Sequence, residues 1–288
     1  MTFTTFYDII MIVVEITKVL GGGCMNINKK GSTECVEFRS LDEFYNYITE
    51  TPFNSSFEHS NKSSMDNDYY FTKTNSFEEA VDIMHHGWSD MSDKLTQRLK
   101  ADSGNMEKVM VSKNTISVQG YQPVVPLFLN NVPANMMSRK LQPMKQKVIT
   151  INKSIAYSAI VTVERIIEES IKALRIIKKL ENQNYRCNLN VIVGTEAGGK
   201  RYCIKIRIKS ANERLNINKL SFPLVHPSML RRLFFRFIEV HPGVSRSFVG
   251  GYGTPLQPED YRSIYPDEIL LPQFINKDVD KIKSLEDL

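Results

Sequence analysis

A glycine-rich stretch, VIVGTEAGGKR at residues 191–201, has the residue types that could bind a phosphate. An apolar run leads into Gly194, and after four further residues come Gly199 and Lys200, which is how a Walker A loop opens. Such a loop needs Ser or Thr after its lysine to hold magnesium, and a helix whose N-terminus points at the phosphates. Here Arg201 follows, and the next residues alternate between apolar and polar as a strand does. We therefore predict a glycine turn between two antiparallel strands, and no nucleotide site.

Residues for other chemistries are present, but not in the patterns that catalysis needs. The sequence contains no nucleophile elbow, no HExxH and no paired-carboxylate motif. Its four cysteines form no CxxC pair, which indicates free thiols in a reducing compartment. His85 and His86 are adjacent, so on a helix they would point about 100° apart and could not readily share a metal. We expect a protein that is not an enzyme and that has no metal site and no cofactor.

The second half of the chain holds the elements that would position a site. Residues 147–151 (KVITI) are typical of a short buried strand, and Ser158 can cap a long helix that runs to about Asn182. Residues 188–193 predict a second strand, so strand, helix and strand follow one another within about 45 residues. This is a βαβ unit, which predicts a parallel pair of strands joined by a right-handed crossover. The fold class is therefore α/β, with a Rossmann-like mixed sheet and an N-terminal helical arm.

The strand after the glycine turn has a basic face. In RYCIKIRIKS the tyrosine and isoleucines share one face, and the other carries Lys205, Arg207 and Lys209. Lys200 and Arg201 lead into this strand. With the isoleucines in the core, the basic face would meet solvent and could contact the phosphates of a nucleic acid.

The net charge of +5 hides an asymmetry along the chain. Between Arg139 and Glu239, 21 Lys and Arg stand against 7 Asp and Glu, whereas the remainder is acidic. Two interpretations remain open. Either the basic face is a polyanion-binding surface, or the acidic arm packs against it.

A second basic segment lies in a helix that begins near Ser228. Its apolar residues would bury most of the helix surface, and Arg232, Arg236 and Glu239 fall near one face, which predicts an exposed ion-pair ladder. Arg231 lies toward the apolar side, where it would pin a carboxylate or a backbone carbonyl; a structural role is favoured over a ligand role. His226 precedes this helix and is a further candidate for a ligand or structural role.

Composition divides the chain into five segments. They are a translated leader at 1–24, an N-terminal arm with helices at 25–117, a Pro-rich connector at 118–146, the basic α/β domain at 147–253 and a C-terminal tail at 254–288. Two consecutive glycine codons can spell a bacterial ribosome-binding sequence shortly before Met25, so we expect the working protein to begin there. The apolar run in the leader, about six residues, is far too short to span a membrane.

Local signals refine the arm, the connector and the tail. Residues 53–68 are polar and predict a mobile loop. Ser76 starts a helix with a capping-box pattern that ends at Gly87, and a second helix follows at 89–99. The connector is too apolar to be disordered, so we expect it to pack against the next domain. The tail is expected to lie along the surface of the domain.

Two motifs resemble a known protein family. SFPLVHPSMLRRLFFRFIE at 221–239 and SFEEAVDIMHHGWSDMSDKL at 76–95, together with the strand–helix–strand at 147–193, resemble a family of uncharacterised proteins encoded by tailed bacteriophages and prophages. The resemblance covers about residues 70–253. It implies a phage setting, but the family has no function to carry over.

The central unit also resembles a von Willebrand A-like domain. Such domains carry Asp-x-Ser-x-Ser after the first strand, and the matching positions here are Asn152, Ser154 and Ala156. Because a carboxylate and one hydroxyl are missing, the resemblance implies a degenerate fold without a Mg²⁺ site.

These observations together predict a non-enzymatic binding protein of a phage life cycle, in the host bacterial cytoplasm or in the virion. Nucleic acid is the favoured partner. The alternative is a protein–protein role, as a virion component or as an inhibitor of a host defence complex. No membrane contact is expected, and the oligomeric state stays open.

Overall fold

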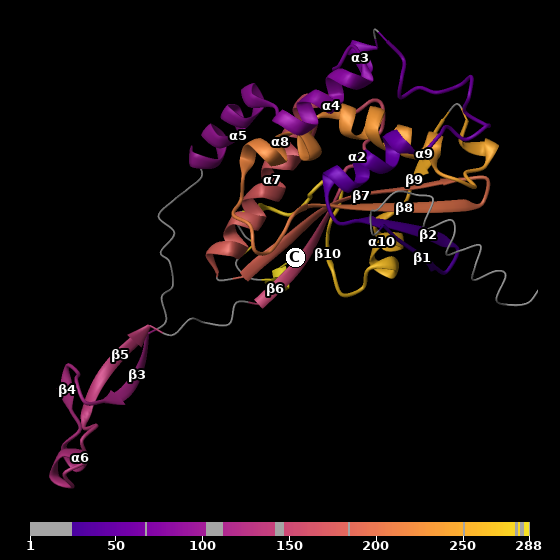
Figure 1. Ribbon diagram of the computed structural model, residues 1–288. Coiled ribbons are helices and arrows are strands. Elements are labelled where there is room, and N and C mark those ends of the chain that lie inside the picture. Colours follow the sequence, from indigo (N-terminus) through magenta and orange to yellow (C-terminus); the bar gives the residue numbers. More distant parts are fainter. Residues whose placement is uncertain are drawn as a thin grey trace, which may run out of the picture.

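A mixed sheet forms the centre of the protein, whose structure is a computed structural model (Figure 1). It describes residues 25–66, 68–101, 112–141, 147–183, 185–249, 251–279, 282 and 285–287. The predicted leader at 1–24 lies outside these residues. The sheet consists of β1 (Asn26–Lys30), β2 (Thr33–Phe38), β6 (Lys147–Ser154), β7 (Tyr185–Ala197), β8 (Lys200–Lys209), β9 (Thr254–Pro255) and β10 (Ile269–Leu271). Its order is β1-β2-β8-β7-β6-β10, with β9 paired to β7.

The strand directions confirm the predicted α/β class and the Rossmann-like βαβ unit. β6 pairs in parallel with β7 and β10, β2 pairs in parallel with β8, and β7 and β8 are antiparallel. The crossover helix α7 (Val163–Asn182) joins β6 to β7. It begins later than predicted, because the Thr162 side chain, not Ser158, accepts the capping hydrogen bond from the Arg165 backbone N–H.

The glycine turn between β7 and β8 is confirmed. β7 continues to Ala197, and the turn is made by Gly198 and Gly199, with φ of +58° and +75°. Glycine adopts such angles without the steric cost that a Cβ would bring. Lys200 opens strand β8 and not a helix, so the backbone geometry of a Walker A loop is not formed.

Helices cover both faces of the sheet. One face carries α2 (Leu41–Glu50), α7, α8 (Ile217–Val225), the π-helix η1 (Met229–Phe234) and α9 (Phe235–Val240) (Figure 1). The opposite face carries α10 (Pro258–Ile264), whose apolar side chains pack with Cys35, Ile192 and Cys203. Because the sheet is covered on both sides, its strands bury residues of both alternating sets. Within the described residues, no helix is long and apolar enough to cross a membrane.

The N-terminal segment is part of this body and not a separate arm. β1 and β2 extend the sheet next to β8, and α4 (Phe77–His86) and α5 (Ser89–Ala101) contact α8. The predicted capping at Ser76 is confirmed, since its side chain accepts from the Glu79 backbone N–H at 3.1 Å. The short helix α3 (Tyr69–Thr72) precedes α4.

The loop at 53–68, predicted to be mobile, is held by contacts to the second half of the chain. Phe57 and Ser63 are fully buried. The prediction of a mobile loop rested on the polar composition and is wrong. The residues that bind the loop lie about 170 positions further along the chain, in η1 and α9, so the local sequence does not show them.

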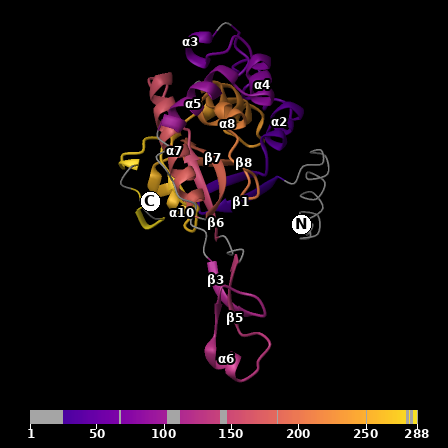
Figure 2. The same ribbon diagram turned by 90° about the vertical axis from the view of Figure 1, so that its left-hand side faces the viewer.

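Residues 118–141, the described part of the predicted connector, are not packed against the domain (Figures 1 and 2). The described part folds with β3 (Ser112–Ser117) into a small sheet of β3, β5 (Met136–Leu141) and β4 (Gln122–Pro123), with the short helix α6 (Val125–Leu129) at its tip. We call residues 112–141 the β arm; both views show it apart from the main sheet (Figures 1 and 2). None of residues 114–139 is buried, so the apolar content that predicted packing is exposed.

The tail at 254–288 is built into the fold. Beyond β9 and α10, β10 adds a parallel strand at the edge beside β6. The 3-10 helices η2 (Arg246–Phe248) and η4 (Leu285–Asp287) complete the elements that the structure describes. The segment therefore covers the sheet instead of lying loosely on its surface.

Candidate functional site

The basic face predicted on β8 is not exposed at its centre. Only 8% of Lys205 is exposed, and its Nζ lies 3.1 Å from Glu37 Oε1 and 3.2 Å from Glu268 Oε1. The same ammonium lies 3.9 Å from the centre of the Tyr265 ring. Lys205 is thus enclosed by residues from the N-terminal segment and from the C-terminal segment. The alternative interpretation, in which acidic segments pack against the basic face, describes this lysine.

Lys209 is enclosed in the same way. It is 2% exposed, and its Nζ lies 2.7 Å from Glu181 Oε1 and donates to the Cys187 carbonyl at 3.1 Å. The prediction of a solvent-facing strand is wrong for both lysines: residues around α10 enclose Lys205, and the end of α7 supplies the carboxylate that covers Lys209. Alternation along one strand identifies two faces, but it does not reveal what packs on each.

The two cations at the start of β8 lie at the other end of the strand. Arg201 forms ion pairs with Glu196 at 2.6 Å and with Asp260 at 3.1 Å. The exposed Lys200 donates to the Gly243 carbonyl at 3.2 Å. Seven residues separate Lys200 from Arg207, roughly 23 Å of strand, so the predicted basic residues are not brought together.

Arg207 alone of the strand's three predicted contact residues is exposed, and it lines a groove of about 400 Å³. Arg39, Lys219, His85 and His86 line the same groove. A hollow of about 210 Å³ shares Lys219 with it and adds Arg214. We call Arg39, Arg207, Arg214 and Lys219, with the hollows between them, the basic groove.

Four elements meet at the basic groove. Arg39 follows β2, the two histidines end α4, Arg207 is near the end of β8, and Lys219 lies in the first turn of α8. Gly87 fixes the end of α4 against α8: its φ is +81°, and a Cβ there would lie 2.6 Å from Asn218 Oδ1. Asn218 in turn donates to the His86 carbonyl at 3.2 Å. A larger residue would be strained at this positive φ, and the Asn218 side chain would have to shift.

The cations of the basic groove differ from the buried ones in their partners. Arg39, Arg207, Arg214 and Lys219 are all exposed, and across the ranges that the structure describes none of them forms an ion pair. Two carboxylates lie nearby, but both have contacts of their own: Asp42 is 4.0 Å from His85, and Glu213 accepts from the Ser210 backbone N–H. Positive charge therefore predominates along the groove.

Periodicity could not have found this group. Arg39 was missed because only the pairing of β2 with β8 brings it near Arg207, and Arg214 and Lys219 were missed because they follow the strand and lie outside its alternation.

The positions that resemble a degenerate metal motif are occupied by protein contacts. Asn152 is buried, donates to Glu268 Oε2 at 2.5 Å and accepts from Asn190 Nδ2 at 2.8 Å. The described residues contain no group of three or more His, Cys, Asp or Glu that could hold a metal ion.

Arg231 binds backbone carbonyls, which was one of the two structural roles predicted for it. It is 5% exposed and donates to the carbonyls of Phe71 at 2.6 Å and of Ser158 and Ala159, each at 3.3 Å. Its guanidinium also lies 4.3 Å from the centre of the Phe71 ring. The residue thus joins α3, the loop after β6 and η1.

Arg232, Arg236 and Glu239 do not form an exposed ladder. Arg232 is fully buried and donates to Thr74 and to the carbonyls of Ser63 and Met65 at 2.7–3.0 Å. Arg236 donates to Ser63 Oγ, and the buried Glu239 accepts from the backbone N–H groups of Lys62 and Ser63. The prediction was wrong because the loop at 53–68 covers this helix face. These charges fasten that loop.

His226 has a structural environment. It is 4% exposed, packs against Trp88 and Phe222, and accepts from the Ser228 backbone N–H through Nδ1. Burial lowers the pKa of His226 to about 3, so the ring is neutral at physiological pH.

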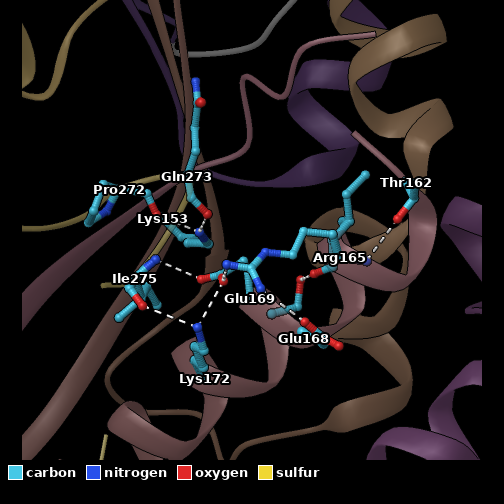
Figure 3. A network of polar contacts seen from close by, with 11 residues as sticks. Lys153, Thr162, Arg165, Glu168, Glu169, Lys172, Pro272, Gln273 and Ile275 are labelled. Carbon is cyan, nitrogen blue, oxygen red and sulfur yellow. Dashed lines mark hydrogen bonds and ion pairs between the residues drawn. The ribbon is translucent and has the colours of Figure 1, made fainter. Parts of the chain in front are cut away.

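A buried network around Glu169 was missed by the sequence reasoning (Figure 3). Glu169 is fully buried in α7, and its carboxylate lies 3.0 Å from Arg165 and 2.9 Å from Lys172 and accepts from the Ile275 backbone N–H at 2.6 Å. Lys153, also fully buried, donates to the carbonyls of Pro272 and Gln273. The network holds the chain after β10 against the sheet. A charge within the buried stripe of a helix is the sequence signal that could have pointed to it.

Comparison with known proteins yields one match. Residues 24–287 match the model of a family described as a domain of unknown function (DUF7192). No curated protein and no solved structure matches the chain.

Proposed function

The chain belongs to the DUF7192 family, and we propose that it is a non-enzymatic binding protein that holds a nucleic acid in the basic groove. The observation that carries this proposal is the contrast among the cations near β8. Lys205 and Lys209 are buried and paired with carboxylates, whereas the four cations of the groove are exposed and have no carboxylate partner among the described residues. The favoured partner stays the one expected from the sequence, but the proposed surface moves from the face of β8 to its end.

A phosphate backbone suits this arrangement. Phosphates accept the N–H groups of arginine and lysine, and each contact releases counterions that had condensed on the nucleic acid. His85 and His86 add two exposed rings at the edge of the groove, on which unstacked bases can pack. The sequence has no motif of a base-reading helix, so we expect binding to depend strongly on salt and little on nucleotide sequence.

The proposal is tested by fluorescence anisotropy. Binding is measured for a 20-nucleotide single strand and for the matching duplex, each at 50 and 200 mM salt. We expect binding that weakens steeply with salt, and a salt slope that falls by about one for each groove cation replaced. The variants are Arg207→Glu and Lys219→Glu. The matched control is Lys200→Glu, which makes the same charge change on an exposed residue at the far end of β8. Absence of binding at 50 mM salt, or an equal loss in the control, would refute the groove.

A second candidate function is a protein–protein role, and the β arm favours it. Val125, Phe128 and Leu129 of α6 are 58%, 61% and 72% exposed. A small sheet with a short helix and no buried residue at positions 114–139 has little to stabilise it alone, and exposed apolar patches mark interaction sites. We propose that these side chains would be covered by a partner protein, as expected for a virion component or an inhibitor of a host complex.

The β arm is tested by the pair of substitutions Phe128→Ser and Leu129→Ser. Co-purification from cells in which the protein occurs naturally should lose a stoichiometric partner in this variant and keep it in Arg207→Glu. A partner retained by the serine variant would exclude the arm as its contact.

A further inference from the structure

A cavity of about 320 Å³ lies between η1, α9 and the sheet, away from the basic groove. Its walls are mainly apolar and include the side chains of Phe71, Val193, Ile204, Leu230, Phe234, Phe235, Ile238 and Tyr252. Protein interiors are close-packed, and voids larger than a water molecule are few. An apolar cavity of about 150 Å³ stays dry and binds benzene, so a cavity of twice that volume has room for two fused rings.

The position of the cavity is one where α/β proteins hold ligands. It lies beyond the carboxyl end of β6, beside residues 193–195 of β7, and ligands of open α/β sheets bind outside the carboxyl ends of the strands. The helix that covers it, η1, is a π-helix, a rare conformation that is frequent at functional sites. Ser158, Ala159 and Gly251 line the cavity and are exposed, so it opens to the surface at these residues.

Aromatic rings form a continuous part of the cavity wall. Phe235 stacks on Tyr252, with ring centroids 4.1 Å apart and planes inclined by 8°, and its ring centroid lies 6.4 Å from that of Phe71. Phe71, Leu230 and Phe235 are only half-buried, so neighbouring side chains leave part of this wall uncovered. A further ring in the cavity would extend the cluster, and aromatic pairs are stabilised beyond the burial of their area.

The charged residues at the cavity favour an uncharged ligand. Lys62 and Arg231 line it, and no carboxylate is among the described residues that do so. Arg231 donates to three backbone carbonyls; burial lowers its pKa, and the charge of Asp68 opposes this shift, so its charge is balanced within the protein. The two cations lie 4.3 Å from the Phe71 ring centre and 5.7 Å from that of Tyr252. A cationic ligand would be repelled, and any charged group would lose water to apolar walls.

We propose that this cavity binds an uncharged aromatic molecule of about two fused rings. Its rings pack against Phe71, Leu230 and Phe235, and the face of the ring system also suits the neighbouring cations. This site goes beyond the proposed function, since it shares no residue with the basic groove and does not depend on a nucleic acid bound there.

Calorimetric titration tests the proposal with naphthaleneethanol, its decahydro analogue, naphthaleneethylamine and naphthaleneacetate. These compounds share a carbon skeleton and differ in aromaticity or in charge. We expect saturable binding of naphthaleneethanol that is at least about threefold tighter than that of the decahydro analogue, because only the aromatic rings pair favourably with those of the wall. The amine and the acid, both charged at pH 7, should bind at least about tenfold more weakly than naphthaleneethanol.

Two variants locate the binding in the cavity. Phe235→Leu replaces a ring of the wall by an aliphatic side chain and should remove the preference for the aromatic compound over its decahydro analogue. Phe274→Leu is the matched control, because Phe274 is also half-buried and does not line the cavity. Leu230→Trp enlarges a half-buried side chain of the wall and should abolish naphthaleneethanol binding at an unchanged melting temperature.

The titrations of the wild type do not depend on whether a variant folds. Absence of saturable naphthaleneethanol binding, an equal affinity for the decahydro analogue, or equal or tighter binding of a charged compound would overturn the proposal. The same holds if folded Phe235→Leu keeps the aromatic preference or folded Leu230→Trp binds as the wild type does.

Discussion

Lys205 Nζ lies 3.1 Å from Glu37 Oε1, and this pair of a buried lysine and a half-buried glutamate joins β8 to β2 across 168 positions of sequence. Because β2 pairs with β8 in parallel and in register at these two residues, the ion pair is set by the backbone and not by a chance meeting of long side chains. The same lysine would have been the centre of a solvent-facing basic strand had the sheet been covered on one side only.

Charge reversal at two positions of β8 should therefore affect the free energy of unfolding differently, because Lys205 is buried and Arg207 is exposed. Lys205→Glu places a carboxylate beside Glu37 and Glu268, and we expect it to lower the free energy of unfolding by about 3–5 kcal/mol. Arg207→Glu, on an exposed residue that pairs with no carboxylate in the described part of the chain, should change it by no more than about 0.5 kcal/mol. Urea denaturation followed by circular dichroism measures both, and equal effects would contradict the burial of Lys205.

Lys153 should make the protein more stable at alkaline pH. Burial lowers the pKa of Lys153 to about 7, Glu169 opposes this shift and Lys172 adds to it. Between pH 7 and the unfolded pKa near 10.5, the unfolded chain binds the proton and the folded protein does not, so stability falls as pH falls through this window. The slope is at most about 1.4 kcal/mol per pH unit. Urea denaturation at pH 7, 8 and 9 should show it in the wild type, and Lys153→Met should reduce it; an unchanged slope would mean that Lys153 is charged when buried.

His226 should also make the protein less stable as the pH falls, but in the acid range. Its pKa is lowered to about 3 by burial, so the stability that it contributes is complete above pH 6.5 and is lost as pH falls from 6.5 toward 3. His226→Asn keeps an acceptor for the Ser228 backbone N–H but does not titrate. The variant should be less stable at pH 7, since the contacts with Trp88 and Phe222 are lost, yet its melting temperature should fall less between pH 6.5 and 4.5. A parallel decline in both proteins would assign the acid sensitivity to other groups.

Arg232 should control the order of residues 53–68. Arg232→Met leaves the carbonyls of Ser63 and Met65 and the Thr74 hydroxyl without their donor, and each buried unpaired group costs about 1–3 kcal/mol. Limited proteolysis should then cleave this loop well before the rest of the protein. Arg214→Met, on an exposed residue, is the control. If the loop in Arg232→Met resists protease as the wild type does, the arginine does not fasten it.

The sequence predicted those elements that are determined by residues close together in the chain. The βαβ unit at 147–193, the glycine turn and the helix after Ser76 follow from periodicity, capping and backbone preferences within short windows, and all three are confirmed. What sequence could not reveal is what covers each surface. Lys205 is enclosed by Glu37 and Glu268, and the loop at 53–68 by α9, because of contacts between residues far apart in the chain. The basic groove is missing from the sequence pattern for the same reason.

The pairing of β2 with β8 has a consequence for synthesis. At about 5–20 residues per second, roughly 10 to 30 s pass between the translation of Thr33 and that of its partner Arg201. During that time the edge of β2 that pairs with β8 has no partner, and a β1–β2 hairpin would present it as a template for pairing with other chains. The sheet is complete only after β10 has been made. Contacts of such long sequence separation slow folding, so the yield of native protein depends on keeping this early hairpin unpaired until β8 emerges.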